Sequence, residues 1–381
     1  MDLNKIRTDI NQVDNDLLAL LAKRRQLTLN VARSKEIDLK PVRDQEREHQ
    51  LLEKLVALGK DQGLDAQYVV RLFQTIIEDS VLRQQAWLQG RQNTSQDLVT
   101  VAYLGARGSY SHIAAQGYFT RREMSMVEMG CPDFHEVIQA VEQGNADYGI
   151  LPIQNTSSGF INEVYDLLQQ THLQIVGETT ETIGHCLLTL PGADLDAIDT
   201  IYAHPQVLSQ CSNHLRGYPR VKLEYCASSA HAMALVADGK DPTKAAIASQ
   251  AGGALYGLEV RREKLANQAD NESRFILVAR KAKEVPVQVP AKTTLIMATG
   301  QKAGALVDAL LVLKNNGLIM SKLTSRPIPG NPWEEMFYLD VEANLSSGPM
   351  QQALSELVPI TRFVKVLGCY QSERILPTEL E

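Results

Sequence analysis

The hydrophobic and polar positions divide the chain into three stretches with different patterns. Residues 3–90 contain one proline and repeat apolar side chains at helical spacing nearly throughout, which predicts an all-α segment. After residue 97, short apolar runs alternate with helical patterns, which predicts an α/β segment. From residue 293 the pattern predicts the order βαββαβ of ferredoxin-like α+β folds.

Two polar stretches separate these patterns, at residues 91–97 and 281–292. Neither shows apolar periodicity, so we interpret both as linkers. A length of 381 residues also favours two or three domains rather than one. We therefore predict three domains, which are all-α, α/β and ferredoxin-like α+β in chain order and cover residues 1–92, 97–280 and 292–381.

Composition narrows the choice of partners. The net charge of −7 offers no basic field for nucleic acid. No apolar run reaches the ~18 residues that span a bilayer, and the N-terminus does not resemble a secretory signal. The five cysteines are scattered, as in reduced cytoplasmic proteins, with no spacing for a disulfide framework or a metal site. We expect a cytoplasmic protein without metal or cofactor, in which a few cations hold any anionic ligand.

Three cations, Arg7, Arg24 and Lys35, lie on one long helical stripe that is otherwise largely apolar. They could extend their charged ends to solvent or pair with acids of neighbouring helices. A bound anion is the other explanation, because an unpaired charge on such a seam is costly. Arg24 and Lys35 are about 17 Å apart along a helix, whereas Arg7 is about 42 Å from Lys35. Arg7 could therefore serve this kind of site only from a second subunit of a symmetric dimer.

Two further helices add polar groups at helical spacing. Asp44, Arg47 and Glu48 open the second helix, and Ser80 and Gln84 lie four apart on one face of the third. No histidine–carboxylate or cysteine–histidine pair is present for nucleophilic catalysis. These residues favour binding and electrostatic stabilisation of a doubly charged anion.

At these motifs the segment resembles the all-helical chorismate mutase family. The matching runs are residues 18–25 (LALLAKRR), Lys35, residues 41–48 (PVRDQERE) and residues 77–84 (IEDSVLRQ). The resemblance covers essentially all of residues 1–90 and implies an intertwined dimer of three-helix subunits.

The resemblance also implies roles in converting chorismate to prephenate. The substrate would be bound by groups that contact its carboxylates and ring, namely Arg7 of the partner subunit, Arg24, Asp44, Arg47 and Ser80. The catalytic groups would be Lys35 and Gln84, which donate hydrogen bonds to the breaking ether oxygen, and Glu48 near the ring hydroxyl. A concerted rearrangement needs no nucleophile, only correct positioning and stabilisation of the developing charge.

The α/β segment carries polar loops where its strands end. They contain mostly Ser, Thr, Asn and Gln, and occupy residues 105–112, 153–159, 204–211, 228–229 and 271–275. Each loop alone could simply cap a helix. Together they predict a cleft for a small polar anion. A zinc site at His204 and Cys211 is disfavoured, because no second pair of ligands lies at suitable spacing.

These loops together resemble the prephenate dehydratases, over roughly residues 98–280. The resemblance implies two α/β lobes of periplasmic-binding-protein type, with prephenate bound between them. The catalytic hydroxyl would be Ser273, at a position where the family favours threonine. The other groups expected to bind substrate are Asn155, Gln206, Ser209 and Arg274. The chain departs from the family at Gln154 and Ala227, where a carboxylate is usual.

The C-terminal segment resembles the ACT regulatory domain of prephenate dehydratases, over about residues 292–370. The resemblance rests on three stretches, residues 304–307 (GALV), 324–327 (TSRP) and 331–338 (NPWEEMFY). It implies that L-phenylalanine binds as an effector at an interface between two such domains. The residues expected to bind it are Gly304, Ala305, Leu306, Val307, Ser325, Arg326 and Pro327. Thr324 stands where the family usually has glutamate.

Three hypotheses of function follow. The leading one is a bifunctional enzyme that makes phenylpyruvate from chorismate and is inhibited by L-phenylalanine. The second is a monofunctional mutase whose later segments bind ligands without turnover, a hypothesis that Gln154, Ala227 and Ser273 keep open. The third is a solute-binding sensor with a helical dimerisation arm. The combination of Arg24, Lys35 and Gln84 argues against the third, because a plain dimer seam would not contain it.

Overall fold

The structure is a computed structural model that describes residues 3–38, 41–92, 98–268, 270–300, 302–328 and 331–372. The chain forms two compact units, each built from separate stretches of sequence. The first unit comprises residues 1–95, 283–365 and 369–381, and the second comprises 96–282 and 366–368.

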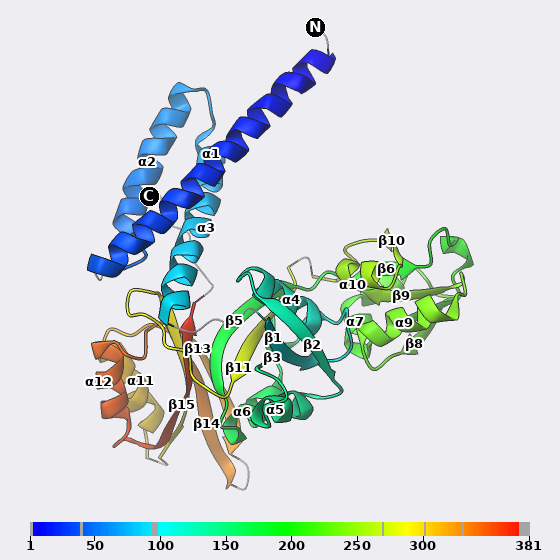
Figure 1. Ribbon diagram of the computed structural model, residues 1–381. Coiled ribbons are helices and arrows are strands. Elements are labelled where there is room, and N and C mark those ends of the chain that lie inside the picture. Colours follow the sequence, from blue (N-terminus) through cyan, green and yellow to red (C-terminus); the bar gives the residue numbers. More distant parts are fainter. Residues whose placement is uncertain are drawn as a thin grey trace. The chain divides into compact units, whose positions relative to one another are not determined.

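The first unit begins with three helices. They are α1 (Leu3–Asp38), α2 (Gln45–Asp61) and α3 (Ala66–Gln92) (Figure 1). Asp44 caps α2 by accepting a hydrogen bond from the backbone N–H of Arg47 at 3.0 Å. The predicted linker at 91–97 starts late, because α3 continues to Gln92; residues 93–97 lie outside the described residues.

The C-terminal part of the first unit has the predicted βαββαβ order. Its elements are β12 (Ala291–Thr299), α11 (Ala305–Asn315), β13 (Met320–Ile328), β14 (Asn331–Val341), α12 (Gly348–Leu357) and β15 (Thr361–Gln371). The strands form one sheet in the order β13-β14-β12-β15. Both helices lie on the same face of this sheet (Figure 1), where Leu313 and Leu357 pack against Leu295 and Leu339.

Residues 283–290 lie in the connection between β11 and β12 and form a packed segment. Val289 is 1% exposed, and together with Val285 it packs against Val42, Leu52 and other apolar residues of the helices. The backbone N–H of Val42 donates to the carbonyl of Gln288 at 2.9 Å. The predicted linker at 281–292 contains the boundary between the two units, at residues 282 and 283, but its pattern did not predict that two buried valines anchor it.

The second unit contains two sheets. The first has the order β2-β1-β3-β11-β5, with β4 beside β3. Its elements are β1 (Leu98–Leu104), α4 (Tyr110–Thr120), β2 (Ser125–Cys131), α5 (Phe134–Glu142), β3 (Tyr148–Asn155), β4 (Gly159–Phe160), α6 (Asn162–Gln170), β5 (Gln174–Thr182) and β11 (Glu272–Ala279). Helix α4 packs so closely on this sheet that a side chain at Gly177 would collide with the Tyr118 hydroxyl.

The second sheet has the order β10-β6-β9-β7-β8. Its elements are β6 (Cys186–Thr189), the short 3₁₀ helix η1 (Leu195–Ala197), β7 (Thr200–Ala203), α7 (Pro205–Gln210), α8 (Ser212–Leu215), β8 (Lys222–Tyr225), α9 (Ser229–Gly239), β9 (Lys244–Ala248), α10 (Gln250–Leu255) and β10 (Glu259–Arg262). The two sheets confirm the α/β prediction for this part of the chain.

The chain crosses between the two sheets twice, after β5 and before β11. The two crossing segments are joined by a hydrogen bond from the Ile183 N–H to the Asn271 carbonyl, at 2.7 Å. Asn155 at the end of β3 and Ser273 at the start of β11 are register partners beside these crossings. The expected polar groups of this unit therefore gather where the chain changes sheets.

Candidate functional sites

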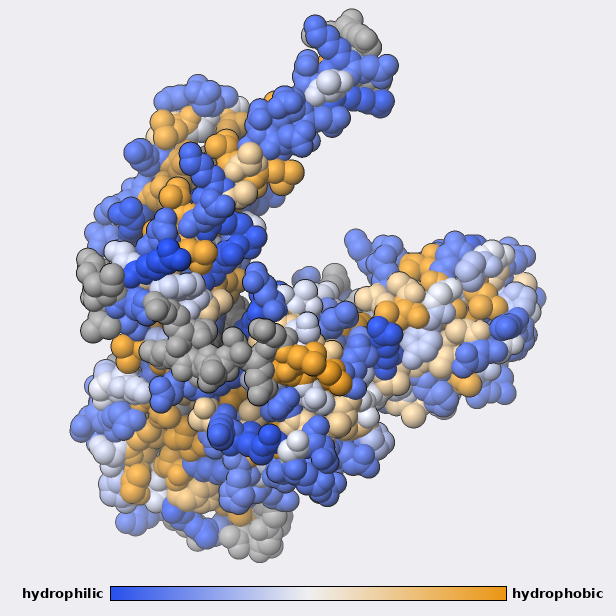
Figure 2. Space-filling model, viewed as in Figure 1, coloured by the Kyte–Doolittle hydropathy of each residue, from blue (hydrophilic) through white to orange (hydrophobic). Residues whose placement is uncertain are grey.

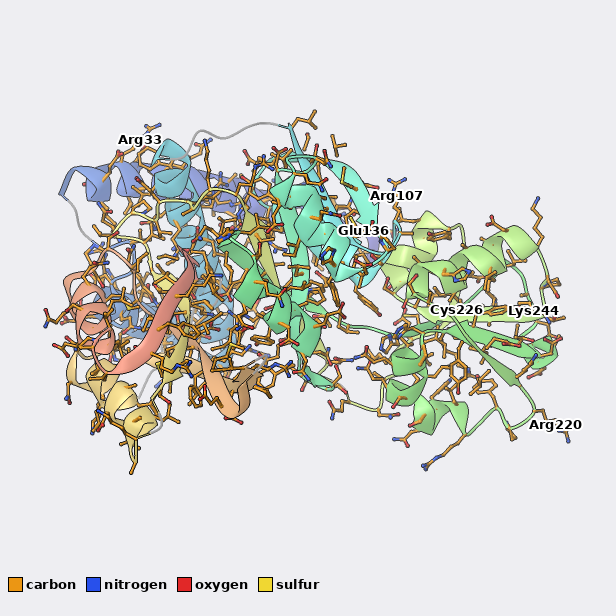
Figure 3. The ribbon with its side chains drawn as sticks, turned by 90° about the horizontal axis from the view of Figure 1, so that it is seen from below. Arg33, Arg107, Glu136, Arg220, Cys226 and Lys244 are labelled. Atoms are coloured by element: carbon orange, nitrogen blue, oxygen red, sulfur yellow. The ribbon has the colours of Figure 1, made fainter. Side chains whose placement is uncertain are left out.

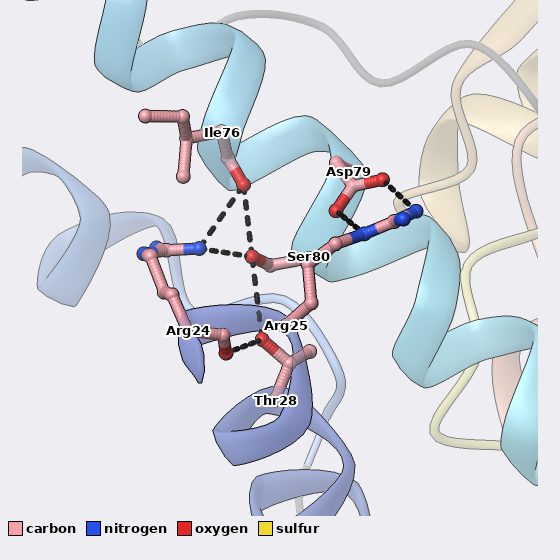
Figure 4. A network of polar contacts seen from close by, with 6 residues as sticks. All are labelled: Arg24, Arg25, Thr28, Ile76, Asp79 and Ser80. Atoms are coloured by element: carbon pink, nitrogen blue, oxygen red, sulfur yellow. Dashed lines mark hydrogen bonds and ion pairs between the residues drawn. The ribbon is translucent and has the colours of Figure 1, made fainter. Parts of the chain in front are cut away.

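In the helical segment, Arg24 lies between α1 and α3. Its guanidinium donates to the hydroxyl of Ser80 and to the carbonyl of Ile76, and the Ser80 hydroxyl donates to that same carbonyl at 2.8 Å (Figure 4). Burial lowers the pKa of Arg24, while nearby Asp79 raises it. The neighbouring Arg25 instead forms a two-pronged ion pair with Asp79, at 2.7 and 2.9 Å. The two arginines thus have different electrostatic surroundings.

Lys35 is the second cation of this cluster. Its ammonium donates to the carbonyl of Val42, so the end of α1 is tied to the start of α2. Burial lowers the pKa of Lys35, Asp44 and Glu48 raise it, and Arg47 lowers it. The carboxylate of Glu48 is buried and bound to Arg43 at 3.2 Å.

Gln84 is 7% exposed on α3, and its amide nitrogen donates to the Ser80 carbonyl at 3.2 Å. Its oxygen, Oε1, is buried without a hydrogen-bond partner within the described part of the chain. One N–H of the amide and this oxygen are therefore available to a ligand. Buried amide groups are rarely left unpaired, so such a group needs an explanation.

The structure thus brings Arg24 to Ser80 and Gln84 on α3, and brings Lys35 close to Glu48 where α1 meets α2. Arg47 and Asp44 are exposed in the first turn of α2 and its cap. Arg7 is exposed near the start of α1, more than four helical turns before Arg24. Within one subunit Arg7 is not part of this cluster.

In the second unit, Asn155 holds Ser273. The Asn155 amide nitrogen donates to the Ser273 hydroxyl oxygen at 2.9 Å and to the Asn271 side-chain oxygen at 2.7 Å. Both Asn155 and Ser273 are buried. Because Ser273 Oγ accepts from Asn155, the serine hydrogen remains able to donate to another group.

Gln206 approaches the same cluster from α7. Its amide nitrogen donates to the Ser158 hydroxyl at 2.8 Å, and that hydroxyl donates to the side-chain oxygen of Asn155 at 3.0 Å. Ser209 lies on the same helix, and its carbonyl accepts a hydrogen bond from Asn267. Three of the five residues predicted from the prephenate dehydratase motifs, Asn155, Gln206 and Ser273, are therefore linked by hydrogen bonds, with Ser158 between Asn155 and Gln206.

Arg274 has a different position. Its guanidinium is bound to the buried carboxylate of Glu178 at 2.6 Å. Successive residues of a strand point to opposite faces, so Arg274 and its register partner Gln154 lie on the face opposite Ser273 and Asn155. The Gln154 position therefore does not directly face the Ser273 hydroxyl.

Ala227, the other departure from the family, follows Cys226 at the end of β8 in the second sheet. Figure 3 places Cys226 in this lobe, together with Lys244 and Arg220. Ser228 accepts a hydrogen bond from the His231 N–H and caps α9. Ser228 therefore provides the hydroxyl that caps α9, and the neighbouring Ala227 adds no charge to this loop.

The residues expected to bind an effector lie at the start of α11 and on β13. Gly304 caps α11 with a φ of +83°, a conformation that favours glycine. Val307 is 58% exposed, while Ala309 on the same helix is buried. On β13, Thr324 is buried, and its hydroxyl lacks a hydrogen-bond partner among the residues described.

Sequence patterns missed several participants. Thr28 is 6% exposed and lies beside Ser80, and the Val42 carbonyl receives Lys35. In the second unit, His185 and Gln210 extend the Asn155 network. Thr28 lies four residues after Arg24 on the same helix, so helical spacing could have indicated that the two side chains share a face. No sequence pattern indicated the contacts of the Val42 carbonyl and the His185 ring, because these contacts depend on how the loops fold.

Within the described ranges, no group of three His, Cys, Asp or Glu side chains could hold a metal ion. No described helix is both long enough and apolar enough to cross a bilayer.

Comparison with known proteins assigns a family to the helical segment and to the α/β segment. Residues 6–85 match the type II chorismate mutases, and residues 101–283 match the prephenate dehydratases. The chain is also similar in fold to the prephenate dehydratase of Arthrobacter aurescens solved in complex with L-Phe. That similarity has a TM-score of 0.66 at 25% identity and covers 74% of this chain and 93% of the other.

Full-length relatives join the two segments. A bifunctional chorismate mutase/prephenate dehydratase from Enterobacter agglomerans is 58% identical over 98% of this chain and 97% of its own length. The protein of the same description from Escherichia coli K12 is 56% identical over the same shares. The chain belongs to the family of bifunctional chorismate mutase/prephenate dehydratases, which confirms the two activities of the leading hypothesis.

Proposed function

We propose that residues 1–92 form a chorismate mutase domain, residues 97–280 a prephenate dehydratase domain and residues 292–381 an ACT regulatory domain. The substrates are chorismate and prephenate, the product is phenylpyruvate, and L-phenylalanine is the effector. The observation that carries this proposal is that the helical segment holds two half-buried cations, Arg24 and Lys35, and a buried amide, Gln84, that is partly unpaired among the described residues.

In the mutase site, Arg24 binds a carboxylate of chorismate, and Ser80 holds the guanidinium in place. Lys35 and Gln84 donate hydrogen bonds to the ether oxygen, on which negative charge develops as its bond to the ring breaks. A carbon–carbon bond forms in the same step, so neither a nucleophile nor a cofactor is required. Donors that are already oriented typically contribute about 10²–10³ in rate each. Asp44 and Glu48 lie on the side of the ring hydroxyl.

A second copy of the chain completes this site. Val13, Leu17 and Leu20 on α1 are 62%, 49% and 66% exposed. Apolar side chains (orange) also lie at the surface of the helical segment in Figure 2. An apolar stripe of this length needs a covering partner, and the matching stripe of another α1 provides one. The partner subunit then supplies Arg7, with Arg47 assisting at the carboxylates.

In the dehydratase site, the Ser273 hydroxyl donates a hydrogen bond to the ring hydroxyl of prephenate as that group leaves. The ring carboxylate departs as carbon dioxide, its electron pair enters the ring, and the hydroxyl leaves as water after gaining a proton. The contact from Asn155 supports this role, because it occupies the Ser273 oxygen and leaves the hydrogen free to donate. Gln206 and Ser209 bind the substrate from α7 in the second of two lobes of periplasmic-binding-protein type. Arg274 contributes through its ion pair with Glu178.

L-phenylalanine binds to the C-terminal domain. The sheet order β13-β14-β12-β15 supports an ACT fold. The Gly304 cap supports a ligand at the start of α11, contacted by Ala305, Leu306 and Val307, with Ser325, Arg326 and Pro327 on β13. All five cysteines are free thiols, which supports a cytoplasmic location.

The two proposed sites are tested by a pair of variants supplied with chorismate. Lys35→Ala is expected to lower mutase turnover by about 10²–10³ and to leave turnover of added prephenate unchanged. Ser273→Ala is expected to do the reverse and to accumulate prephenate. Chorismate absorbance and the alkaline absorbance of phenylpyruvate measure the two steps.

Lys23→Ala, on an exposed position of the same helix, is the control for Lys35→Ala. Joint loss of both activities in folded Lys35→Ala protein would contradict separate sites. Prephenate accumulating in the wild-type enzyme would support the monofunctional alternative. Added L-phenylalanine should reduce phenylpyruvate formation.

A further inference from the structure

A chain of polar side chains, four of them buried, runs from the Ser273 hydroxyl across both segments that connect the two sheets of the second unit. Its members are joined by side-chain contacts and are, in order, Ser273, Asn155, Asn271, Gln210, His185 and Tyr110. At the far end of these contacts, Tyr110 lies at the start of α4, and His185 follows β5.

The directions of these hydrogen bonds are fixed from the Asn155 end. The side-chain oxygen of Asn155 accepts from the backbone N–H groups of Ser157 and Ser158, each at 2.9 Å. Backbone N–H groups can only donate, so the other end of this amide must be the NH₂ group. The Asn155 nitrogen therefore faces the Asn271 oxygen at 2.7 Å.

The same reasoning continues to His185. With its oxygen toward Asn155, Asn271 turns its nitrogen toward the Gln210 oxygen at 3.4 Å, a long contact. That oxygen also lies 2.8 Å from Nε2 of His185, so Nε2 must carry a hydrogen. Burial lowers the pKa of His185, which favours the neutral ring. In the neutral ring Nδ1 has no hydrogen, and the single hydrogen of the Tyr110 hydroxyl is shared between Nδ1, at 3.0 Å, and the Gly184 carbonyl, at 2.9 Å.

His185 is well placed to hold this network. Its ring is 1% exposed and meets Tyr110 edge-on, with ring centres 5.8 Å apart. The His185 carbonyl also accepts from the Leu265 N–H on the returning segment, at 3.0 Å. The imidazole therefore has little freedom to move, and it fixes the orientation of the Gln210 amide.

We propose that His185 is a positioning residue for the dehydratase reaction, which it serves through Gln210, Asn271 and Asn155 by orienting the Ser273 hydroxyl. It does not contact the reacting atoms. The inference rests on the proposed role of Ser273. If the Nε2–H donor is lost, the Gln210 amide can rotate. Its oxygen then no longer holds the side chain of Asn271, whose own oxygen receives the N–H of Asn155 beside Ser273.

His185→Phe removes the donor and keeps a ring of similar size. It is expected to lower dehydratase kcat by about 10- to 100-fold with little change in KM, because a misplacement of about 1 Å costs up to about 10² in rate. His185→Gln carries an N–H near the position of Nε2 and should recover most of this loss. A merely structural role would not distinguish these variants by kcat at equal thermal stability.

A second comparison tests whether His185 acts through the network. Asn271→Ala interrupts the same chain, so the variant with both His185→Phe and Asn271→Ala should be no slower than the worse single variant. Independent effects would multiply instead. His214→Phe is the matched control, because His214 lies in the same lobe outside the network, where its ring meets Tyr218. It should retain wild-type dehydratase kcat.

Wild-type kcat in His185→Phe, or multiplied losses in the double variant, would overturn the proposal. If His185→Phe does not fold, as judged by thermal unfolding, His185→Gln decides: near-normal kcat supports the proposal and a large loss overturns it. Full dehydratase activity in Ser273→Ala would refute the proposed site itself. Loss in Ser273→Ala together with normal activity in His185→Phe would refute only the role of His185.

Discussion

Arg24 and Arg25 are adjacent on α1, yet their surroundings suit them to different tasks. Arg25 pairs with the carboxylate of Asp79 at a largely exposed position, where such pairs contribute at most about 1 kcal/mol. Arg24 is half-buried and is bound to a hydroxyl and a carbonyl, neither of which neutralises its charge. A substrate carboxylate would provide that neutralisation.

Lys35 makes the mutase step sensitive to alkaline pH. The site needs its ammonium form, and burial lowers the pKa of Lys35. Mutase kcat/KM should therefore fall as pH rises, at a lower pH than the ordinary lysine value of about 10.4 would give. Between the folded and unfolded pKa values the unfolded chain binds more protons, so this lysine's contribution to stability rises with pH.

The measurement is a profile of mutase kcat/KM from neutral to alkaline pH. Lys23→Ala should keep the wild-type profile, because Lys23 is exposed on the same helix. A fall that begins only at the ordinary lysine value would show that Lys35 is not the titrating donor.

Helical spacing predicted that Arg24 and Lys35 share a stripe of α1 and that Ser80 and Gln84 share a face of α3, whereas joining them in one site rested on the resemblance to the chorismate mutases. Side chains three or four residues apart share a face, so such residues can be recognised without coordinates. The Val42 carbonyl and the His185–Gln210 contact could not be predicted, because they depend on loop conformations between elements. Strand alternation alone could have predicted that Arg274 points away from Ser273, because the two residues are successive in β11.

At the scale of elements, α1 has two different halves. Residues 7–20 are exposed on all sides, whereas Thr28 and Ala32 in the second half are buried against the other helices. A helix with one half uncovered gains stability by packing against a partner. The sequence predicted the helix and its apolar stripe, but the stripe alone does not say which surface covers it.

Two inactive variants should complement one another if the subunits share sites. Arg7→Ala and Lys35→Ala should each lack mutase activity as pure proteins. In a mixed dimer, one of the two sites keeps both the native Lys35 and the partner's native Arg7. Since random pairing gives half mixed dimers, co-expression should restore about one quarter of wild-type mutase activity.

Each single variant should retain dehydratase activity, which controls for folding. A co-expressed mixture that stays as inactive as the separate variants would show that Arg7 does not act across a dimer.

At the scale of the whole molecule, apolar patterning predicted the order of segments and the βαββαβ order of the last one. It did not predict that the helical and C-terminal stretches belong to one compact unit. Their shared core includes Leu52, Ile77, Val285 and Val289. The buried side chains of Gln85 and Gln371 are also joined by a hydrogen bond at 2.7 Å. Such pairing between distant residues leaves no local signal in a single sequence.

The packed segment 283–290 should therefore support the mutase. Val289→Asp places a charge among apolar side chains, which is costly unless the charge is paired. It should lower the temperature at which mutase activity is lost by several degrees, while the dehydratase persists to higher temperature. Activities measured after heating to a series of temperatures test this expectation.

Val287→Asp makes the same change two residues away, at a position that is 62% exposed, and should have little effect. Equal sensitivity of the two variants would contradict a supporting role for the buried valine.

The composition of the first unit also has a consequence for protein synthesis. Helices α1 to α3 leave the ribosome first, but the partners that complete their core are encoded after residue 283. About 190 residues must be translated in between, which takes roughly 10–40 s at about 5–20 residues per second. During that interval the middle unit can fold, while Leu52 and Ile77 still lack the part of their core that Val285 and Val289 supply. The segment made first is therefore the one that most needs protection from aggregation in the nascent chain.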